Sequence, residues 1–209
     1  TLKEYVDAMP EGQEKIYFIP GENRERMGKL PQVSALQKRG YDVLLFTEEV
    51  DQFIPQTLMT YQEKGFCNAA SEDLQLQTEE EKKHAQEQTE EKKGFLTFVK
   101  ECLGDQVKEV RLSGELGSHC VCMKPDAGMS FEMEKYMKRV NPEFAFNVGR
   151  ILELNPEHSA VQALEKAMTA DPVKAKDYAL LLMYQAQLMA ELPLEDPMAY
   201  TELVCKLMN

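Results

Sequence analysis

Residues 171–192 read DPVKAKDYALLLMYQAQLMAEL and predict one long helix. Asp171 is a good N-cap, Pro172 suits the first helical position, and Pro193 cannot continue the helix. The same Asp-Pro pair recurs at 196–197 and predicts a second helix that runs to the C-terminus. The chain is therefore expected to end as a helical hairpin.

Apolar residues cover too wide an arc of this hairpin for its two helices to bury them against each other. Pairing with the hairpin of a second copy would form a four-helix bundle, and homodimerisation is our hypothesis. The alternative, that the hairpin docks on its own domain, stays open from periodicity alone. The predicted dimer interface comprises Tyr178, Leu181, Leu182, Gln185, Leu188, Met189, Tyr200, Leu203, Val204 and Leu207.

The residues before the hairpin alternate between helical and strand patterns, which predicts a mixed α+β domain. Asn155 and Pro156 should cap and open the helix that follows the last strand, as Asp171 and Pro172 do for the hairpin. The expected elements are a helix over 95–103, strands over 107–112, 119–123 and 150–154, and a helix over 156–168.

The first part of the chain predicts a small α/β layer. Two β-rich runs, at 15–19 and 41–46, enclose a helical segment that ends at Gly40, so the two strands should be parallel. A further strand is expected near 65–68, after a helix capped by Thr47.

A charged segment over 71–93 separates the two parts, with TEEEKK at 78–83 and TEEKK at 89–93. Charge pairs at helical spacing predict a solvated connecting helix, for which a binding role is not needed. The predicted fold class is therefore α/β followed by α+β. Residues 1–92 would form a small, three-layer-like α/β domain with the charged connecting helix, and residues 93–209 a mixed α+β domain whose helical hairpin dimerises.

Composition limits the classes of partner. The chain has 36 acidic and 24 basic residues and a formal net charge of -12, which argues against nucleic acid or an anionic membrane as the main partner. No apolar run approaches the roughly 20 residues that span a bilayer. Five scattered cysteines fit a reducing cytoplasm. The start at Thr1, without an initiator Met or signal peptide, suggests a piece of a longer chain.

Chemical motifs are weak throughout the sequence. His119, Cys120 and Cys122 lack the second ligand pair of a closed zinc site, and no base for a cysteine nucleophile can be identified. Gly28 and Lys29 lack the surrounding pattern of a phosphate-binding loop. We therefore predict no catalytic residue, no metal and no cofactor in this chain, and an enzyme using His119 and Cys120 is a poorly supported alternative.

One segment, residues 128–140 (GMSFEMEKYMKRV), predicts an amphipathic helix with a methionine-rich face. Methionine is flexible and polarisable, so such a face can repack around different apolar partners. The alternative is that the face belongs to the core. The apolar face comprises Met129, Met133, Tyr136, Met137 and Val140, and the charged side comprises Glu132, Glu134, Lys135, Lys138 and Arg139.

These segments together resemble the heat-shock protein 90 family, and specifically its bacterial, high-temperature protein G type. LKEYV at 2–6 with EGQEKIYFI at 11–19 is similar to the middle-domain segment of that family. KRGYDVL at 38–44 and VDQF at 50–53 resemble its next block, and VKEVRL at 107–112 with RILELNPEH at 150–158 resembles its C-terminal domain. The resemblance covers the chain from end to end.

The resemblance implies the distal middle domain and the C-terminal dimerisation domain of a homodimeric, ATP-driven chaperone. ATP and Mg²⁺ would be bound upstream of Thr1, so this chain would not itself be an enzyme. It would bind partly folded client proteins, and the alternative is a structural dimerisation module without client contact.

The resemblance also implies residues that contact clients and excludes one class of partner. Gln52 stands where many relatives have an acid, and Pro55 interrupts a helix that relatives continue. Without an acidic Met-Glu-Glu-Val-Asp tail, tetratricopeptide cochaperones are not expected, and a bacterial cytoplasmic origin is favoured. The implied client-binding residues are Phe53, Met129, Met133, Tyr136 and Met137.

Overall fold

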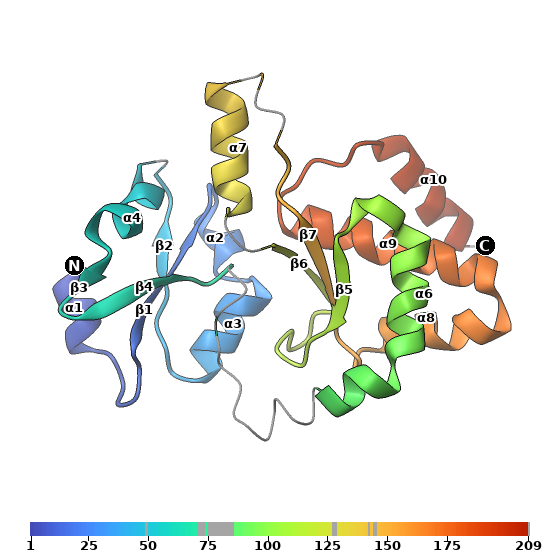
Figure 1. The fold of residues 1–209 in the computed structure, drawn as a ribbon, viewed down its shortest axis with the longest axis horizontal. Helices are drawn as coiled ribbons and strands as arrows, with labels where there is room; N and C mark the ends of the chain where they lie inside the picture. The colour runs from blue at the N-terminus through green and yellow to red at the C-terminus, as the bar shows by residue number, and fades with distance from the viewer. Residues whose placement is uncertain are drawn as a thin grey trace. The chain divides into compact units, whose positions relative to one another are not determined.

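The computed structural model describes residues 1–48, 50–70, 74, 86–126, 129–141, 143 and 146–208, with the backbone alone for Gln52. Its contacts divide the chain into two compact units, whose elements are labelled in Figure 1. The first unit contains residues 1–76 and 127–148, and the second contains residues 77–126 and 149–209. Residues 127–148 thus pack with the first unit, whereas the boundary predicted after residue 92 stays a prediction.

The first unit is built on a four-stranded mixed sheet with the order β2-β1-β4-β3. β1 is parallel to both β2 and β4, which confirms the parallel pairing expected from the sequence, and β3 pairs antiparallel with β4. The elements of this unit are α1 (Leu2–Asp7), β1 (Lys15–Pro20), α2 (Arg24–Met27), α3 (Pro31–Lys38), β2 (Leu44–Phe46), a 3-10 turn (Asp51–Phe53), α4 (Ile54–Leu58), β3 (Thr60–Tyr61), β4 (Lys64–Asn68) and α7 (Phe131–Val140).

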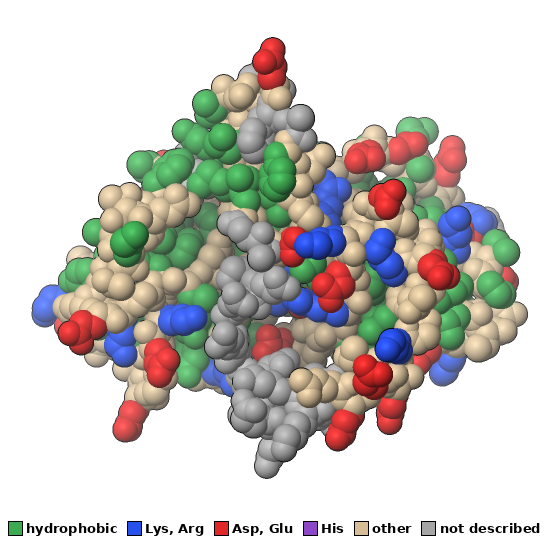
Figure 2. Space-filling view, viewed as in Figure 1, with side chains coloured by type: hydrophobic (Ala, Val, Ile, Leu, Met, Phe, Trp, Pro, Cys, Tyr) green, Lys and Arg blue, Asp and Glu red, His purple; other side chains and the backbone are tan. Residues whose placement is uncertain are grey.

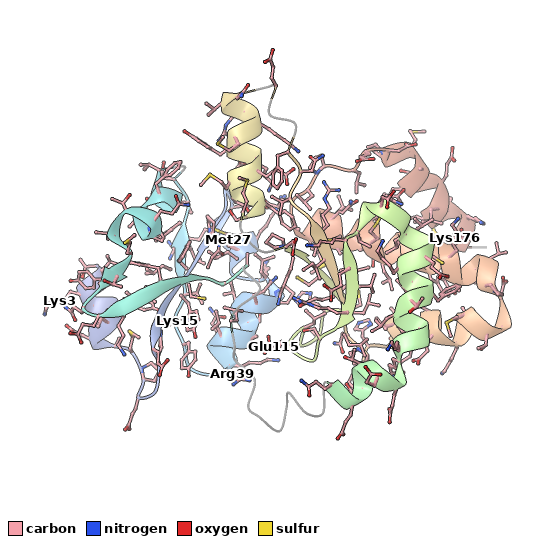
Figure 3. All side chains as sticks on the ribbon, in the orientation of Figure 1. Lys3, Lys15, Met27, Arg39, Glu115 and Lys176 are labelled. Atoms are coloured by element: carbon pink, nitrogen blue, oxygen red, sulfur yellow. The ribbon has the colours of Figure 1, made fainter. Side chains whose placement is uncertain are left out.

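The core of the first unit lies along β1, which is buried over five of its six residues. On one face, Tyr17 and Ile19 pack with residues of α2 and α3, including Met27, which Figure 3 labels. On the other face, the ring of Phe18 stacks on that of Phe46, with ring centroids 5.2 Å apart. Side chains cover both faces of the strand, as expected for a parallel sheet.

The second unit is built on a three-stranded mixed sheet with the order β5-β7-β6, in which β7 is parallel to β5 and antiparallel to β6. Helices α8 and α9 pack against each other, α9 packs on β6, and α6 packs on β5. The elements of this unit are α6 (Lys93–Leu103), a 3-10 turn (Gly104–Gln106), β5 (Glu109–Leu112), β6 (Val121–Pro125), β7 (Arg150–Leu154), α8 (Ser159–Ala170), α9 (Pro172–Met189) and α10 (Pro197–Leu207).

The helix expected to start at Pro156 was predicted too early. Asn155 does not cap a helix: its Nδ2 donates to the carbonyl oxygens of Gly117 and His119, at 3.1 and 3.0 Å, and its Oδ1 accepts from the backbone N–H of Glu157. The helix begins instead at Ser159, and His158 is its N-cap.

Two other boundaries differ from the prediction. The second strand forms only over Leu44–Phe46, and the expected 119–123 strand forms over Val121–Pro125. The prediction of a helix capped by Thr47 is also wrong, because the chain makes the 3-10 turn Asp51–Phe53 before α4 begins.

The charged connecting helix lies mostly outside the described residues. Residues 86–91 are helical and are separated from α6 by its N-cap, Lys92. Lys92 pairs with Glu165 of α8, with both Nζ–O distances at 2.6 Å. No helix in the described part of the chain has the length and apolar character that a bilayer crossing requires.

Candidate functional site

The methionine-rich segment forms helix α7 over Phe131–Val140, which confirms the helix but not its predicted start, because Met129 lies before the N-cap. Ser130 caps it, accepting a hydrogen bond on Oγ from the backbone N–H of Met133 at 3.2 Å. Glu132 and Glu134 occupy the first turn, and basic side chains occupy the last turn. This distribution complements the helix dipole and stabilises an otherwise short helix.

The methionine face of α7 is half-buried. Met129, Met133, Tyr136 and Met137 all have intermediate exposure, while Val140 at the helix end is 63% exposed. A core face would be closed to solvent, and this face is not, so its side chains are partly accessible within the unit.

Phe53 lies on the 3-10 turn that precedes α4. Pro55 lies in the first turn of α4, where its missing N–H costs nothing, so the chain forms two short elements here. Thr57 Oγ1 donates to the carbonyl oxygen of Phe53 at 2.9 Å, which links the turn to the helix. The 3-10 turn runs directly into α4, which contains Pro55, and the interruption expected relative to the family stays a prediction.

Phe53 and α7 come together in the first unit although about eighty residues separate them in the sequence. The ring of Phe53 contacts the ring of Tyr136 edge to face, with centroids 5.4 Å apart and an interplanar angle of 76°. Such edge-to-face contacts are favourable for aromatic pairs. The structure thus brings together two of the predicted site residues from separate blocks of the sequence.

Further exposed apolar residues, which sequence reasoning missed, belong to the same unit. Figure 2 shows hydrophobic side chains gathering over α4 and α7 on the face in view. We call Phe53, the α7 face and these residues together the apolar surface of the first unit. The additional members are Val50, Leu58 and Met59, which are 67%, 46% and 74% exposed.

Met59 has an unusual backbone. Its φ of 59° and ψ of -53° lie in the region of the strained γ-turn, although it is not a glycine. Its N–H donates to the carbonyl oxygen of Pro55 at 2.9 Å. Nothing in a periodic pattern marks such a residue, because it lies between elements.

The predicted dimer interface maps to α9 and α10, which form an antiparallel hairpin. Tyr184 contacts Tyr200 edge to face at 5.8 Å, and Lys206 pairs with Asp177 at 2.5 Å. Two of the predicted interface residues, Leu182 and Leu203, are already buried within the unit.

The other predicted interface residues remain partly accessible. On α9, Tyr178, Leu181, Gln185 and Leu188 follow a 3-4-3 spacing, which is the spacing of a coiled-coil seam. Leu188 is 47% exposed, and the other three are half-buried. Met189, Tyr200, Val204 and Leu207 are also half-buried. Their role in an interface stays a prediction.

The cysteines do not form a reactive centre in the described part of the chain. Burial raises the pKa of the Cys120 thiol, which opposes the formation of a nucleophilic thiolate. Burial also raises the pKa of Cys102, against the weaker opposite effect of Lys176 on α9, which Figure 3 labels. No group of three or more His, Cys, Asp or Glu among the described residues could hold a metal ion.

Comparison with known proteins identifies the family. The family model described as Hsp90 protein matches residues 1–209. Chaperone protein HtpG of Bacillus subtilis is 38% identical to this chain over 208 residues, and that of Clostridium acetobutylicum is 40% identical over 209 residues. HtpG of Clostridium botulinum is 38% identical over 209 residues.

Each of these matches covers 100% of this chain and 33% of the relative. These relatives are all named as chaperone proteins. The chain belongs to the Hsp90 family, as the sequence resemblance indicated, and it spans about a third of the length of the curated relatives it matches.

Proposed function

We propose that this chain is the part of an Hsp90-type chaperone that contacts partly folded client proteins and joins two copies of the protein. The observation that supports client contact is the apolar surface of the first unit, where Phe53 meets the half-buried methionine face of α7. Flexible methionine side chains beside an aromatic ring can adapt to many apolar segments, each of which would bind weakly.

The remaining parts of the proposal concern the whole protein. ATP and Mg²⁺ would act in a longer chain that includes this one as its distal middle and C-terminal domains. Client proteins and a second copy of the chain are the proposed partners, whereas nucleic acid and membranes are not. The bacterial cytoplasm is the proposed location, in keeping with the absence of a disulfide among the described residues, which include all five cysteines.

Replacing both Met133 and Met137 by Ser tests client contact. Removing two apolar side chains from the surface should weaken client binding about tenfold, because each contributes roughly 1 kcal/mol or less to a half-open contact. The measurement is suppression of aggregation of a thermally unfolding client, with sedimentation equilibrium to show that the assembly state is unchanged.

A matched control is Met208→Ser, at a position that is 81% exposed, ends α10 and lies outside both predicted surfaces. It should leave suppression unchanged. Equal suppression by the Met133→Ser, Met137→Ser variant and by the wild-type chain, at equal mass, would contradict client contact at α7.

In the alternative, a structural dimerisation module, the methionine face of α7 would be buried. If the face instead contacts clients, Met133 and Met137 should be oxidised by mild peroxide faster than Met123 and Met183, which are 3% and 0% exposed. Oxidation of all four at the same slow rate would favour the structural module.

A further inference from the structure

Glu134 is buried, although the sequence pattern assigns it to the charged side of α7. Only 4% of its surface is exposed. A buried carboxylate is costly unless its oxygens are paired, so its partners show what the residue does.

The carboxylate of Glu134 joins α7 to the segment that returns from it. Its Oε2 accepts a hydrogen bond from the buried backbone N–H of Val148 at 3.0 Å. Its Oε1 pairs with the ammonium group of Lys138, one turn further along the helix. Lys138 in turn donates to Oδ1 of Asn147 at 2.6 Å. Both carboxylate oxygens are therefore used, and residues 147–148 are fixed along one side of α7.

This attachment lies on a side of α7 that adjoins the methionine face. At about 100° per residue, Glu134, Lys138 and the buried Phe131 lie together on one side of the helix. Met133, Tyr136 and Met137 lie further round the helix, with Met137 only about 60° from Glu134. Because a short helix rotates about its axis as a rigid body, fixing the Glu134 side also fixes the direction in which the methionine face points.

We propose that Glu134 is a positioning residue for client contact: by holding residues 147–148 against α7, it keeps the methionine face turned toward Phe53. The proposal depends on the proposed client function of that face. Loss of Glu134 leaves the buried N–H of Val148 without its acceptor and frees the helix to rotate, so that the contact between Tyr136 and Phe53 is lost.

The test uses Glu134→Leu and Glu134→Gln in the full chain. The amide of Gln still offers an oxygen to the N–H of Val148, whereas Leu offers none. Hydrogen exchange at the Val148 amide should become about tenfold faster in Glu134→Leu and change much less in Glu134→Gln. Client suppression should fall in the same order, with unchanged mass. Glu132→Gln, which alters the half-buried carboxylate paired with Lys135 on the same helix, is the matched control and should change neither.

A spectroscopic signal reports the helix orientation directly. The chain has no tryptophan, so Phe53→Trp provides a single emitter next to Tyr136. In that background, Glu134→Leu should shift the emission to longer wavelength as α7 moves away, and Glu134→Gln should restore most of the original emission. A stabilising but non-positioning role would lower the unfolding free energy without this shift.

Two outcomes would overturn the proposal. One is an unchanged Val148 exchange rate and unchanged emission in Glu134→Leu. The other is a Glu134→Leu variant in which the Val148 exchange rate and the emission both change but client suppression stays at the wild-type level. This outcome counts only if the Met133→Ser, Met137→Ser variant reduces client suppression. If that methionine variant has no effect either, the proposed client function has failed, and the exchange and emission data still decide whether Glu134 holds α7. If Glu134→Leu does not fold, Lys138→Met and Asn147→Ala must produce the same shift and loss.

Discussion

Tyr5 holds three segments of the first unit together through its hydroxyl group. The hydroxyl donates to the carbonyl oxygen of Asp42 at 2.7 Å. It accepts from Nε2 of Gln13 and from the backbone N–H of Tyr17, both at 3.0 Å. One phenol thus links α1, the start of β1 and the loop before β2, and two of these three bonds are buried.

Tyr5→Phe should lower the free energy of unfolding of the first unit by about 1–3 kcal/mol at neutral pH, because the N–H of Tyr17 loses its acceptor in a buried site. Urea unfolding followed by circular dichroism measures this change. Tyr17→Phe is the control, because it keeps the ring that stacks on Tyr41 at 5.7 Å. An equal cost for the two variants would show that the Tyr5 hydroxyl contributes nothing specific.

The same two tyrosines predict a loss of stability at alkaline pH. Burial raises the pKa of Tyr17 to about 12 and also raises the pKa of Tyr5. An unfolded tyrosine titrates near pH 10, so the folded state favours the neutral phenol. The contribution of Tyr17 is fully present below about pH 10 and is lost as the pH rises through about 12, and that of Tyr5 changes in the same direction.

Unfolding measured between pH 9 and pH 12 checks this prediction. The wild-type chain should lose stability steadily above pH 10, by up to about 1.4 kcal/mol per pH unit for each tyrosine. Tyr17→Phe should lose less over the same range. Parallel curves for wild type and variant would contradict the pKa shift of Tyr17.

At the scale of elements, the sequence predicted a helix start correctly where the capping side chain bonds to a residue in the first turn. Asp171 and Asp196 accept hydrogen bonds on their side chains from the N–H groups of Lys174 and Ala199, at 3.1 and 3.0 Å. Both partners lie within three residues, so the motif alone specifies them. Asn155 looks equivalent, but its amide reaches Gly117 and His119, nearly forty residues earlier. Such a competing tertiary partner cannot be seen in a local motif.

The candidate site shows the same limit. Helix α7 was predictable because its methionines recur at helical spacing. Val50 and Met59 were not predicted, because they lie in irregular segments where no period distinguishes an exposed side chain from a buried one. Burial of Glu134 was also hidden, since its acceptor role depends on where residues 147–148 return, and a charged residue is ordinarily assigned to the surface.

At the scale of the whole molecule, the hairpin still offers apolar area that remains partly exposed among the described residues. The contact between Tyr184 and Tyr200 and the pair between Asp177 and Lys206 place α10 on one side of α9. The seam defined by Leu181 and Leu188 stays partly accessible, and apolar residues at this spacing are usually covered by another helix. A second copy of the hairpin would supply that helix and complete a four-helix bundle.

Leu181→Glu combined with Leu188→Glu should therefore convert a dimer into a monomer, because a bundle would have to bury two unpaired carboxylates per chain. Sedimentation equilibrium across a wide concentration range should show a dissociation constant raised by at least about a hundredfold. Val173→Glu is the matched control: Val173 is 70% exposed on the same helix but lies off the seam, so the dimer should persist. A wild-type chain that stays monomeric at every concentration would remove the dimer from the proposal, and client contact would still be decided by the methionine variants.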